Sequence, residues 1–457
     1  MASAEAVICG AGIGGVAAAW ELAVARGVRD VLIVDPLPPL SLTSDKSTEC
    51  YRNWWPSAAM VALMNRSVER LDAWAAASGD RFALNRNGYL YVTADPARAE
   101  QLVREGATAS EHGAGVLRIH RGAPEDPPYR APRWDRLDAG ADGADYLATP
   151  ELVRGRWPFL APDVVAGLHA RRCGWLSAQQ LGMWLLEEAR AAGARLIEGR
   201  VVGVETDGRG VAAVAVERSG SVERIATRTL VDAAGPHAAA VARLAGVELP
   251  LASELHGKVY FEDRLGVVPR ELPLVIGLDP VELPWSDDER AQLGADPDLA
   301  WLTRPLPGGV HFRPEGGRES RMLLLLWTYH TERVEPAWPP RFDEYYPEVV
   351  VRGVARWVPG FAEYLPLDHR PFVDGGYYTK TPENRFLIGP TPVPGLFLMC
   401  GLSGYGIMGA PAASELLGAQ VTGGALPVYA ADLALARYDD PAYRALLAGG
   451  ELASGQL

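Results

Sequence analysis

Three glycines and one acid near the N-terminus have the types and spacing of a dinucleotide-binding site. The pattern G-x-G-x-x-G at residues 10–15 follows an apolar run at 6–9, and Asp35 ends a second apolar run. The glycines permit a tight turn and a close pyrophosphate, whose charge the next helix N-terminus attracts. Asp35 would accept hydrogen bonds from a ribose, which favours FAD or NAD over NADP. The predicted ligands are Gly10, Gly12, Ile13, Gly14, Gly15 and Asp35.

Two later segments place small-residue turns after predicted strands, at 232–236 and 401–406. Backbone at such turns can pass close to a ligand. A helix beginning after the second turn would stabilise a reduced flavin near N1, although a glycine-rich packing turn is the alternative. The ligands predicted from these turns and from a strand at 200–204 are Val202, Ala234, Gly235, Leu402, Ser403, Gly404, Tyr405, Gly406, Ile407 and Met408.

A second G-x-G-x-x-G occurs at residues 404–409, but no apolar strand ending in an acid follows it, so it does not form a second nucleotide-binding unit. Flavoenzymes that are reduced by NAD(P)H usually carry a second nucleotide-binding fold. The sequence therefore favours FAD as the cofactor and the substrate as the source of electrons.

The elements that must position these groups follow from hydrophobic periodicity. Residues 249–361 are rich in strand-like runs, which indicates a separate sheet. The predicted strands are 6–9, 31–34, 200–204, 211–216, 258–262, 272–276, 321–327 and 396–400, and the predicted helices include 16–26 and 410–421.

Composition limits the class of protein. At 457 residues and 48% hydrophobic, the chain is expected to form two or three lobes around a large core. A net charge of −13 without a basic cluster argues against nucleic acid or an anionic membrane as partner, and favours small molecules. Four scattered cysteines lack metal-ligand or disulfide spacing, so no metal site is expected. With no recognisable signal peptide or membrane span, these features predict a cytoplasmic protein.

The unit at 6–35, the turn at 232–236, "YYTKTPENRFLIG" and "GLSGYGIMGAPA" together resemble the FAD-dependent amine oxidoreductases of the D-amino-acid oxidase superfamily. The branch of monomeric sarcosine oxidase, glycine oxidase and dimethylglycine dehydrogenase is most similar. The resemblance implies an α/β fold, with a Rossmann-type FAD-binding domain and an antiparallel-sheet substrate domain that covers the flavin. The expected boundaries are 1–85, 148–248 and 362–440 for the FAD-binding domain, 86–147 and 249–361 for the substrate domain, and 441–457 for a tail.

The resemblance also implies catalytic candidates. His330 lies in a stretch similar to a sarcosine oxidase segment whose histidine faces the substrate; a hydrogen-bonded sheet histidine is the alternative. The family lysine associated with oxygen activation corresponds to Leu326, which weakens the prediction of an oxidase unless Lys258 supplies the charge from a neighbouring strand. His256 and His311 lie in strand-like stretches and are further candidates to line the pocket.

Two usual carboxylate anchors of the family are replaced, by Tyr378 and Met408. A tyrosine cannot form the bidentate charged clamp of an arginine. The substrate is therefore expected to be an amine without an α-carboxylate, a larger amino-acid derivative, or one bound by Arg52 instead. Tyr378 is expected to orient the amine, and Tyr405 to close the pocket.

The segment "TSDKSTECYRNWWP" at 43–56 runs, in the resembled family, from the pyrophosphate to the isoalloxazine ring. Covalent attachment as in sarcosine oxidase is excluded because Gly376 replaces the linking cysteine. Cys50 stands near the place of the linking histidine of the dimethylglycine branch, so a covalent bond there is the alternative to the expected non-covalent FAD. The ligands predicted from this segment are Thr43, Ser44, Lys46, Ser47, Thr48 and Cys50.

The activity implied by the resemblance is transfer of a hydride equivalent from the carbon beside an uncharged amine to the flavin, which gives an imine that water hydrolyses. We expect an oxidase that forms hydrogen peroxide from oxygen. A dehydrogenase that passes electrons to another acceptor has the same sequence features. Those features also suit the flavin-dependent oxidation of a hydroxy substrate, or a flavin-bearing subunit without catalytic activity.

Overall fold

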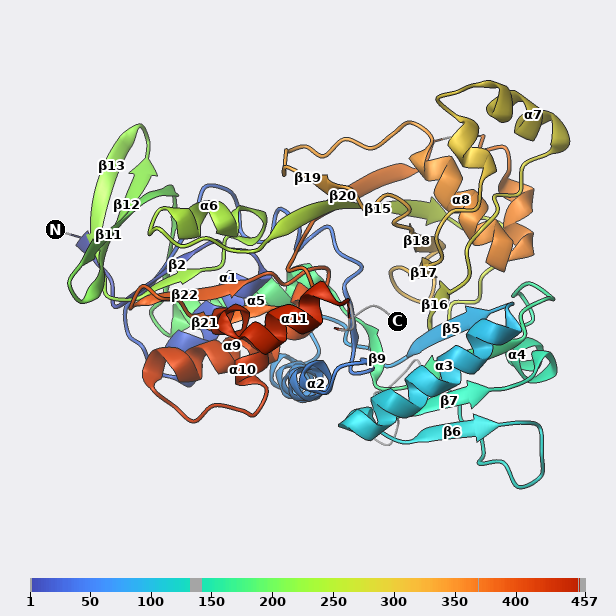
Figure 1. The fold of residues 1–457 in the computed structure, drawn as a ribbon, viewed down its shortest axis with the longest axis horizontal. Helices are drawn as coiled ribbons and strands as arrows, with labels where there is room; N and C mark the ends of the chain where they lie inside the picture. Colours follow the sequence, from blue (N-terminus) through green and yellow to red (C-terminus); the bar gives the residue numbers. More distant parts are fainter. Residues whose placement is uncertain (1, 132–141, 369, 451, 453–457) are drawn as a thin grey trace.

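The computed structural model describes residues 2–131, 142–368, 370–450 and 452. Figure 1 shows two large sheets with their helices. One lies on the left of the view, near the N-terminus, and the other lies on the right. The predicted α/β fold class is confirmed. Residues 132–141, 451 and 453–457, which belong to the expected substrate domain and tail, lie outside the described residues.

The first sheet is built on the glycine unit. Its inner strands are parallel, and only β21 runs antiparallel to its neighbour. The carboxyl ends of parallel strands share one edge, which is where ligands bind in open α/β sheets. In order, the strands are β10 (Arg195–Glu198), β3 (Val31–Asp35), β2 (Ala6–Cys9), β14 (Leu230–Asp232), β22 (Leu396–Cys400) and β21 (Leu387–Pro390).

Apolar helices pack together beside this sheet. The helix after the glycine turn is buried along almost its whole length, which explains its small residues. The helix predicted over 16–26 begins instead at Ile13, and its last residues form a π-helical turn. Glu21 in this turn is buried and forms ion pairs with Arg26 and Arg70. The helices are α1 (Ile13–Trp20), η1 (Glu21–Ala25), α2 (Ala58–Ser78), α5 (Ala178–Ala191), α6 (Ala238–Arg243), α9 (Gly406–Thr422) and α10 (Ala430–Leu433), and α11 (Pro441–Ala448) follows them without a buried residue.

The second sheet has ten strands and is mostly antiparallel. In order, its strands are β19 (Arg333–Val334), β15 (Ala252–Glu262), β18 (Met322–Leu326), β17 (Val310–Pro314), β16 (Leu274–Gly277), β5 (Tyr89–Thr93), β8 (Ala166–Ala170), β7 (Ala144–Leu147) and β6 (Leu117–His120), with β20 (Phe372–Lys380) paired to β15.

The two faces of this sheet have different partners. On one face, Val310 and Phe312 pack in a core with α8 (Tyr346–Trp357). On the other, Tyr91 and Leu274 join the core of the first sheet. This second face therefore looks toward the glycine unit. Further helices are α3 (Pro96–Ala109), α4 (Pro150–Arg156) and α7 (Asp287–Ala295).

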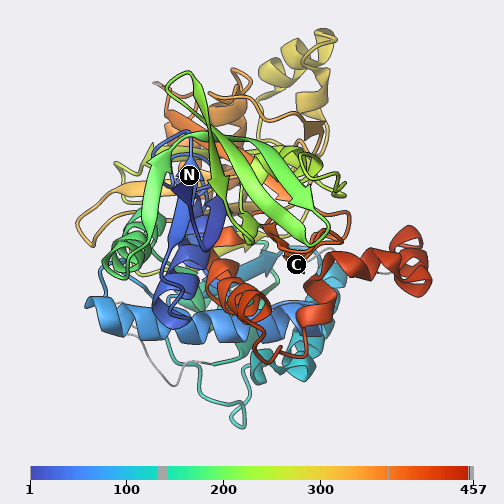
Figure 2. The same ribbon diagram turned by 90° about the vertical axis from the view of Figure 1, so that its left-hand side faces the viewer.

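Two smaller sheets complete the fold. A four-stranded sheet faces the viewer in Figure 2, and a two-stranded sheet holds part of the 43–56 segment. The expected hairpin at 207–208 joins the long strands of the first of these. The strands are β1 (Ala2–Ser3), β13 (Ser221–Ala226), β12 (Gly210–Arg218), β11 (Arg200–Asp207), β4 (Cys50–Arg52) and β9 (Cys173–Trp175).

Strands β8 and β20 belong to the ten-stranded sheet although both lie in ranges expected for the FAD-binding domain. Local periodicity indicates that a strand exists, but the partner of a strand is decided by distant residues. The domain boundaries stay a prediction.

Candidate cofactor and active site

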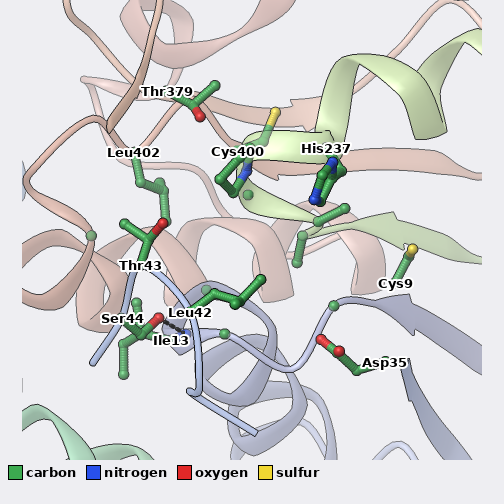
Figure 3. A pocket seen from close by; sticks show the side chains of 18 of the residues that line it. Cys9, Ile13, Asp35, Leu42, Thr43, Ser44, His237, Thr379, Cys400 and Leu402 are labelled. Carbon is green, nitrogen blue, oxygen red and sulfur yellow. Dashed lines mark hydrogen bonds between the residues drawn. The ribbon is translucent and has the colours of Figure 1, made fainter. Parts of the chain in front are cut away.

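A cavity of about 650 Å³ opens at the carboxyl edge of the six-stranded sheet. The turns after β2, β14 and β22 line it, together with most of residues 36–44 and part of β20. Figure 3 shows Asp35 on one side and Thr379 from β20 on the opposite side. The cavity thus extends from the end of β3 to the edge of the ten-stranded sheet.

Close backbone packing shapes the glycine turn. Gly10 has φ of +110°, and a Cβ there would collide with the carbonyl of Ala233. A Cβ on Gly15 would collide with the carbonyl of Gly10, so the helix can approach its strand only with glycine at this position. Ser44 Oγ accepts a hydrogen bond from the Ile13 backbone N–H at 2.9 Å, which ties the 43–56 segment to the helix N-terminus (Figure 3).

Asp35 lies at the end of β3, as predicted. Its carboxylate accepts hydrogen bonds from the backbone N–H groups of Ala11 at 2.7 Å and Leu37 at 2.8 Å. Burial raises its pKa, although these bonds oppose the shift. The side chain is half-buried and lines the cavity, where it can accept a hydrogen bond from a ribose hydroxyl.

Two buried polar atoms at this edge have no hydrogen-bond partner among the described residues: Asp232 Oδ2 and Ser403 Oγ. Ser403 lines the cavity, whereas Asp232 lies beneath it beside Cys9 and Cys400, which do line it. Burial raises the pKa of Asp232 to about 8. An unpartnered hydroxyl, a glycine turn at a helix N-terminus and a strand-terminal acid match the donors and acceptors that a dinucleotide requires. The cavity therefore fits FAD.

Most of the predicted cofactor ligands line this one cavity. They are Gly10, Gly12, Ile13, Gly14, Asp35, Thr43, Ser44, Ser47, Ala234, Gly235, Leu402, Ser403, Gly404, Gly406 and Ile407, and Tyr378 joins them. Other predicted site residues lie outside the lining: Gly15, Lys46, Thr48, Cys50, Arg52, Val202, His256, Lys258, His311, His330, Tyr405 and Met408.

Val202, a predicted cofactor ligand, does not line the cavity, and the geometry of its strand explains why. Successive side chains of a strand point to opposite faces. On β11, Val201 lines the cavity and Val202 points outward, with 38% of its surface exposed. Val201 therefore takes the place in the cavity lining that was predicted for Val202.

Lys46 forms ion pairs instead of lining the cavity. Its Nζ lies 2.7 Å from Asp45 Oδ2 and 2.8 Å from Asp374 Oδ2. These two acids neutralise the charge that was expected to face pyrophosphate. The lysine instead joins the 43–56 segment to β20.

Cys50 is buried, and its Sγ donates a hydrogen bond to the Thr48 carbonyl at 3.2 Å. Burial raises the pKa of the thiol, which disfavours the nucleophilic thiolate. Cys50 is therefore a buried, protonated thiol. The Thr48 carbonyl also accepts a hydrogen bond from Arg313 at 3.0 Å, so this residue supports the segment from outside the cavity lining.

Several lining residues were not predicted. Residues 36–42 directly follow Asp35, so their place near the ribose acid was a usable signal. Trp338 comes from a loop with no motif, and Arg200 and His237 flank recognised elements without any distinguishing pattern. The lining residues that the sequence analysis missed include Pro36, Leu37, Pro38, Leu40, Ser41, Leu42, Arg200, Val201, His237, Trp338, Tyr377, Thr379, Met399 and Cys400.

Tyr378 connects the cavity to the ten-stranded sheet. Its ring stacks on His256 with centroids 3.9 Å apart and planes 19° apart. Burial raises the phenol pKa, so the hydroxyl stays neutral. His256 Nδ1 lies 2.8 Å from Thr328 Oγ1, and Nε2 lies 3.2 Å from Glu254 Oε2. Burial lowers the pKa of His256 to about 4, so the stacked ring is uncharged at neutral pH.

Lys258 is buried on the same sheet face. It stands directly opposite Leu326 in the pairing of β15 with β18, so it lies on a neighbouring strand as predicted. Its Nζ donates to the backbone carbonyls of Asp45 at 3.0 Å and Ser47 at 3.3 Å. Burial lowers its pKa. The ammonium group thus holds the segment that lines the cavity at Ser47.

Arg52 lies in aromatic surroundings at the end of β4. Its guanidinium donates to Tyr91 Oη at 2.7 Å and lies 4.1 Å from the Trp55 ring centroid and 6.0 Å from that of Tyr405. Tyr405 Oη accepts a hydrogen bond from Asn384 at 3.1 Å. Cation–π contacts of this kind hold a guanidinium in a fixed orientation.

His330 is exposed, and its ring packs against Trp301 and Tyr329. It lies just beyond β18, outside the cavity lining. The structure therefore does not bring the leading catalytic candidate together with Tyr378. Within the described ranges, no cluster of metal-ligating side chains and no helix suited to crossing a bilayer is found.

The family of the chain is shown by a match over most of its length. Residues 5–420 match the family model described as FAD dependent oxidoreductase (DAO). The chain matches none of the curated proteins searched.

Several solved structures share the fold. L-proline dehydrogenase from P. horikoshii is 19% identical, with a TM-score of 0.73 over 96% of this chain and 98% of that one. Glycine oxidase from Geobacillus kaustophilus is 18% identical, with a TM-score of 0.71 over 95% and 99%. Iminodiacetate oxidase from Chelativorans sp. BNC1 is 18% identical, with a TM-score of 0.67 over 94% and 98%. At such identities the likeness establishes the fold alone.

Proposed function

Because the chain belongs to the DAO family of FAD-dependent oxidoreductases, we propose that it oxidises the C–N bond of a small amine or amino-acid derivative. The family match confirms the resemblance found in the sequence, and with it the FAD cofactor. Bound FAD supplies the acceptor for a hydride equivalent. The choice of substrate depends on the side chains that surround the flavin end of the cavity.

The cavity is the proposed FAD site, with the pyrophosphate at the α1 N-terminus and the ribose at Asp35. The glycine-rich turn before α9 is the proposed site of the isoalloxazine ring. Tyr378 and Ser403 lie at that end of the cavity. The proposed attachment is non-covalent, because the Cys50 thiol is buried, its pKa is raised, and it lies outside the lining.

Arg52 is the proposed anchor for the polar end of the substrate. Its charge lies among Trp55, Tyr91 and Tyr405, close to the sheet face that carries Tyr378. A fixed guanidinium binds a carboxylate through parallel hydrogen bonds. In this role Arg52 would substitute for the anchors that Tyr378 and Met408 replace.

Tyr378 is the proposed orienting group for the amine, and His256 supports its ring. Both are uncharged, so they favour the uncharged amine, whose lone pair promotes cleavage of the adjacent C–H bond. The buried aromatic side chains around Arg52 would exclude water and hold the C–H bond within reach of the cofactor.

One observation carries this proposal: the cavity that fits FAD ends at a buried sheet face whose Tyr378 and His256 belong to a single stacked pair. An anaerobic titration tests it. Secondary and tertiary amines, amino acids and hydroxy acids are added in turn, and flavin absorbance is recorded. We expect amines to bleach the flavin. Bleaching by hydroxy acids alone would contradict the proposal.

We further propose that oxygen reoxidises the reduced enzyme. Lys258 supports this step because it pairs directly across from Leu326, the position of the family lysine, in the strand register. Admission of air to the bleached protein should restore the absorbance and form hydrogen peroxide. Slow reoxidation by air with fast reoxidation by an artificial acceptor would instead identify a dehydrogenase.

A further inference from the structure

His311 lies in the middle of the sheet face that looks toward the cofactor cavity. The strand registers place it opposite Ile276 on one side and Leu326 on the other, and Leu326 is opposite Lys258. Directly paired residues share a face, and Ile276 packs against the core of the first sheet. His311 therefore points toward the same side as Lys258.

The hydrogen bonding of His311 fixes its tautomer. Nδ1 lies 2.8 Å from the carbonyl of Gly309, and a carbonyl can only accept. Nδ1 therefore carries the proton, and Nε2 presents a lone pair. Burial lowers the pKa of His311, and the nearby Arg52 charge lowers it further, so the ring is neutral at pH 7.

The remaining acceptor is available. Among the described residues no hydrogen bond reaches Nε2. The His311 side chain is half-buried, whereas the neighbouring Leu326 and Lys258 are buried from solvent. A neutral imidazole that is oriented through one nitrogen commonly uses the other to bind a ligand or a substrate.

His256 and His330 cannot take this role. Glu254 has a lowered pKa because hydrogen bonds from His256 and Lys380 outweigh its burial, so it is ionised and accepts from His256 Nε2–H. His256 Nδ1 must then accept from the Thr328 hydroxyl. Both nitrogens of His256 are used, and His330 is exposed.

We propose that His311 Nε2 accepts a hydrogen bond from the N–H group of the uncharged substrate amine, and that the enzyme therefore prefers primary and secondary amines to tertiary amines. This inference rests on the proposed amine oxidation. The Arg52 guanidinium beside the ring repels an ammonium ion, which favours the uncharged amine. The hydrogen bond turns the nitrogen so that its lone pair lies along the C–H bond to be broken.

A pair of substrates that differ by one methyl group on nitrogen tests the inference. The amine that bleaches the flavin fastest is used as its N-methyl and N,N-dimethyl forms, and kcat/KM is measured for each. A tertiary amine leaves Nε2 without a partner in a closed site, which lowers kcat/KM by about 10- to 100-fold. Equal values in the unmodified enzyme would overturn the inference.

His311→Phe removes the acceptor and keeps a flat ring. We expect kcat/KM for the secondary amine to fall by about 10- to 100-fold, with less than about 3-fold change for the tertiary amine. The preference between the two substrates should therefore disappear. A variant with full FAD content that keeps the preference would show that His311 is only a structural residue.

His112→Phe is the matched control, since His112 lies in η2 (Ser110–Ala114) and not on the ten-stranded sheet that carries His311. It should keep the full preference. If His311→Phe fails to bind FAD, His311→Gln is used instead, because it restores an acceptor oxygen and should keep part of the preference for the secondary amine. Complete loss of this preference in His311→Gln would count against the proposal. If no amine bleaches the flavin, the proposed function fails first. If amines do and the preference is absent, only the role of His311 fails.

Discussion

The edge of the six-stranded sheet and the face of the ten-stranded sheet build the two halves of the site in different ways. At the edge, backbone groups and small residues form the site, as where Gly15 packs on Gly10. On the face, side chains from separate strands meet, as where Tyr378 of β20 stacks on His256 of β15. The first half depends on local spacing, and the second depends on strand register. Substitutions at the edge should therefore weaken FAD binding, whereas substitutions on the sheet face should change KM or kcat.

The largest effect is expected at the edge. Gly15→Val places a side chain against the carbonyl of Gly10, where backbone leaves no room. Overpacking against backbone should weaken FAD binding by about 100-fold or more. Isothermal titration of the apoprotein with FAD measures this. Gly208→Ala is the control, because a Cβ there meets nothing within 4 Å, and unchanged binding is expected.

The next effect is expected at Arg52 and should leave FAD binding intact. Arg52→Met keeps an apolar stem against Trp55 and removes the charge. For an amine that carries a carboxylate, KM should rise by about 100-fold, because a charged hydrogen-bonded pair is lost. The KM for the same amine without a carboxylate should change by less than about 3-fold.

Arg66→Met, on the exposed surface of α2, should leave both values unchanged. An equal rise for both amines in the Arg52 variant would mean that Arg52 only supports the fold.

A smaller effect is expected at the stacked pair. His256→Ala removes the ring beneath Tyr378 and should lower kcat by about 10-fold, since stacked rings contribute about 0.5–1.5 kcal/mol. His256→Phe keeps the stack and should recover most of kcat. Steady-state turnover at saturating substrate gives both values of kcat. No recovery with phenylalanine would assign the role to the hydrogen bonds of His256 instead.

The smallest effect concerns stability at the edge. The pKa of Asp232 is raised to about 8 by burial, so the folded state keeps a proton that the unfolded state releases at about pH 4. The free energy of unfolding should therefore fall as pH rises from about 4 to 8. Asp232→Asn should remove this fall and stabilise the protein by about 1–3 kcal/mol above pH 8.

Urea unfolding at pH 5 and pH 9 measures the difference between Asp232→Asn and the unmodified chain. The amide can still accept from the Ala234 N–H, which Asp232 binds at 3.2 Å. A stability gain that is the same at both pH values would contradict the assigned ionisation.

The contrast between the two halves also explains what the sequence could predict. The places of the glycine turn and of Asp35 in the fold could be predicted because they follow from spacing along a single βαβ unit, and their role as FAD ligands stays a prediction. Lys258 was expected on a strand next to that of Leu326, and the register places it there, whereas its role as a substitute charge stays a prediction.

Other residues could not be placed in this way. The sequence does not show which face of β11 is buried, so Val202 was chosen instead of Val201. Nothing in the sequence shows that Asp45 and Asp374 neutralise Lys46. His330 and His311 lie in similar apolar stretches, and only the ends of β17 and β18 decide which of them points inward. Contacts between distant strands determine these features.

The central claim is that the sheet face presents the C–H bond beside a substrate nitrogen to FAD in the cavity. The most direct measurement is the anaerobic rate of flavin bleaching by an amine that carries deuterium on that carbon, compared with the undeuterated amine at saturation. Cleavage of that bond in the reducing step predicts a rate several-fold lower with deuterium. Equal bleaching rates at every pH, or bleaching by hydroxy acids but by no amine, would contradict the claim.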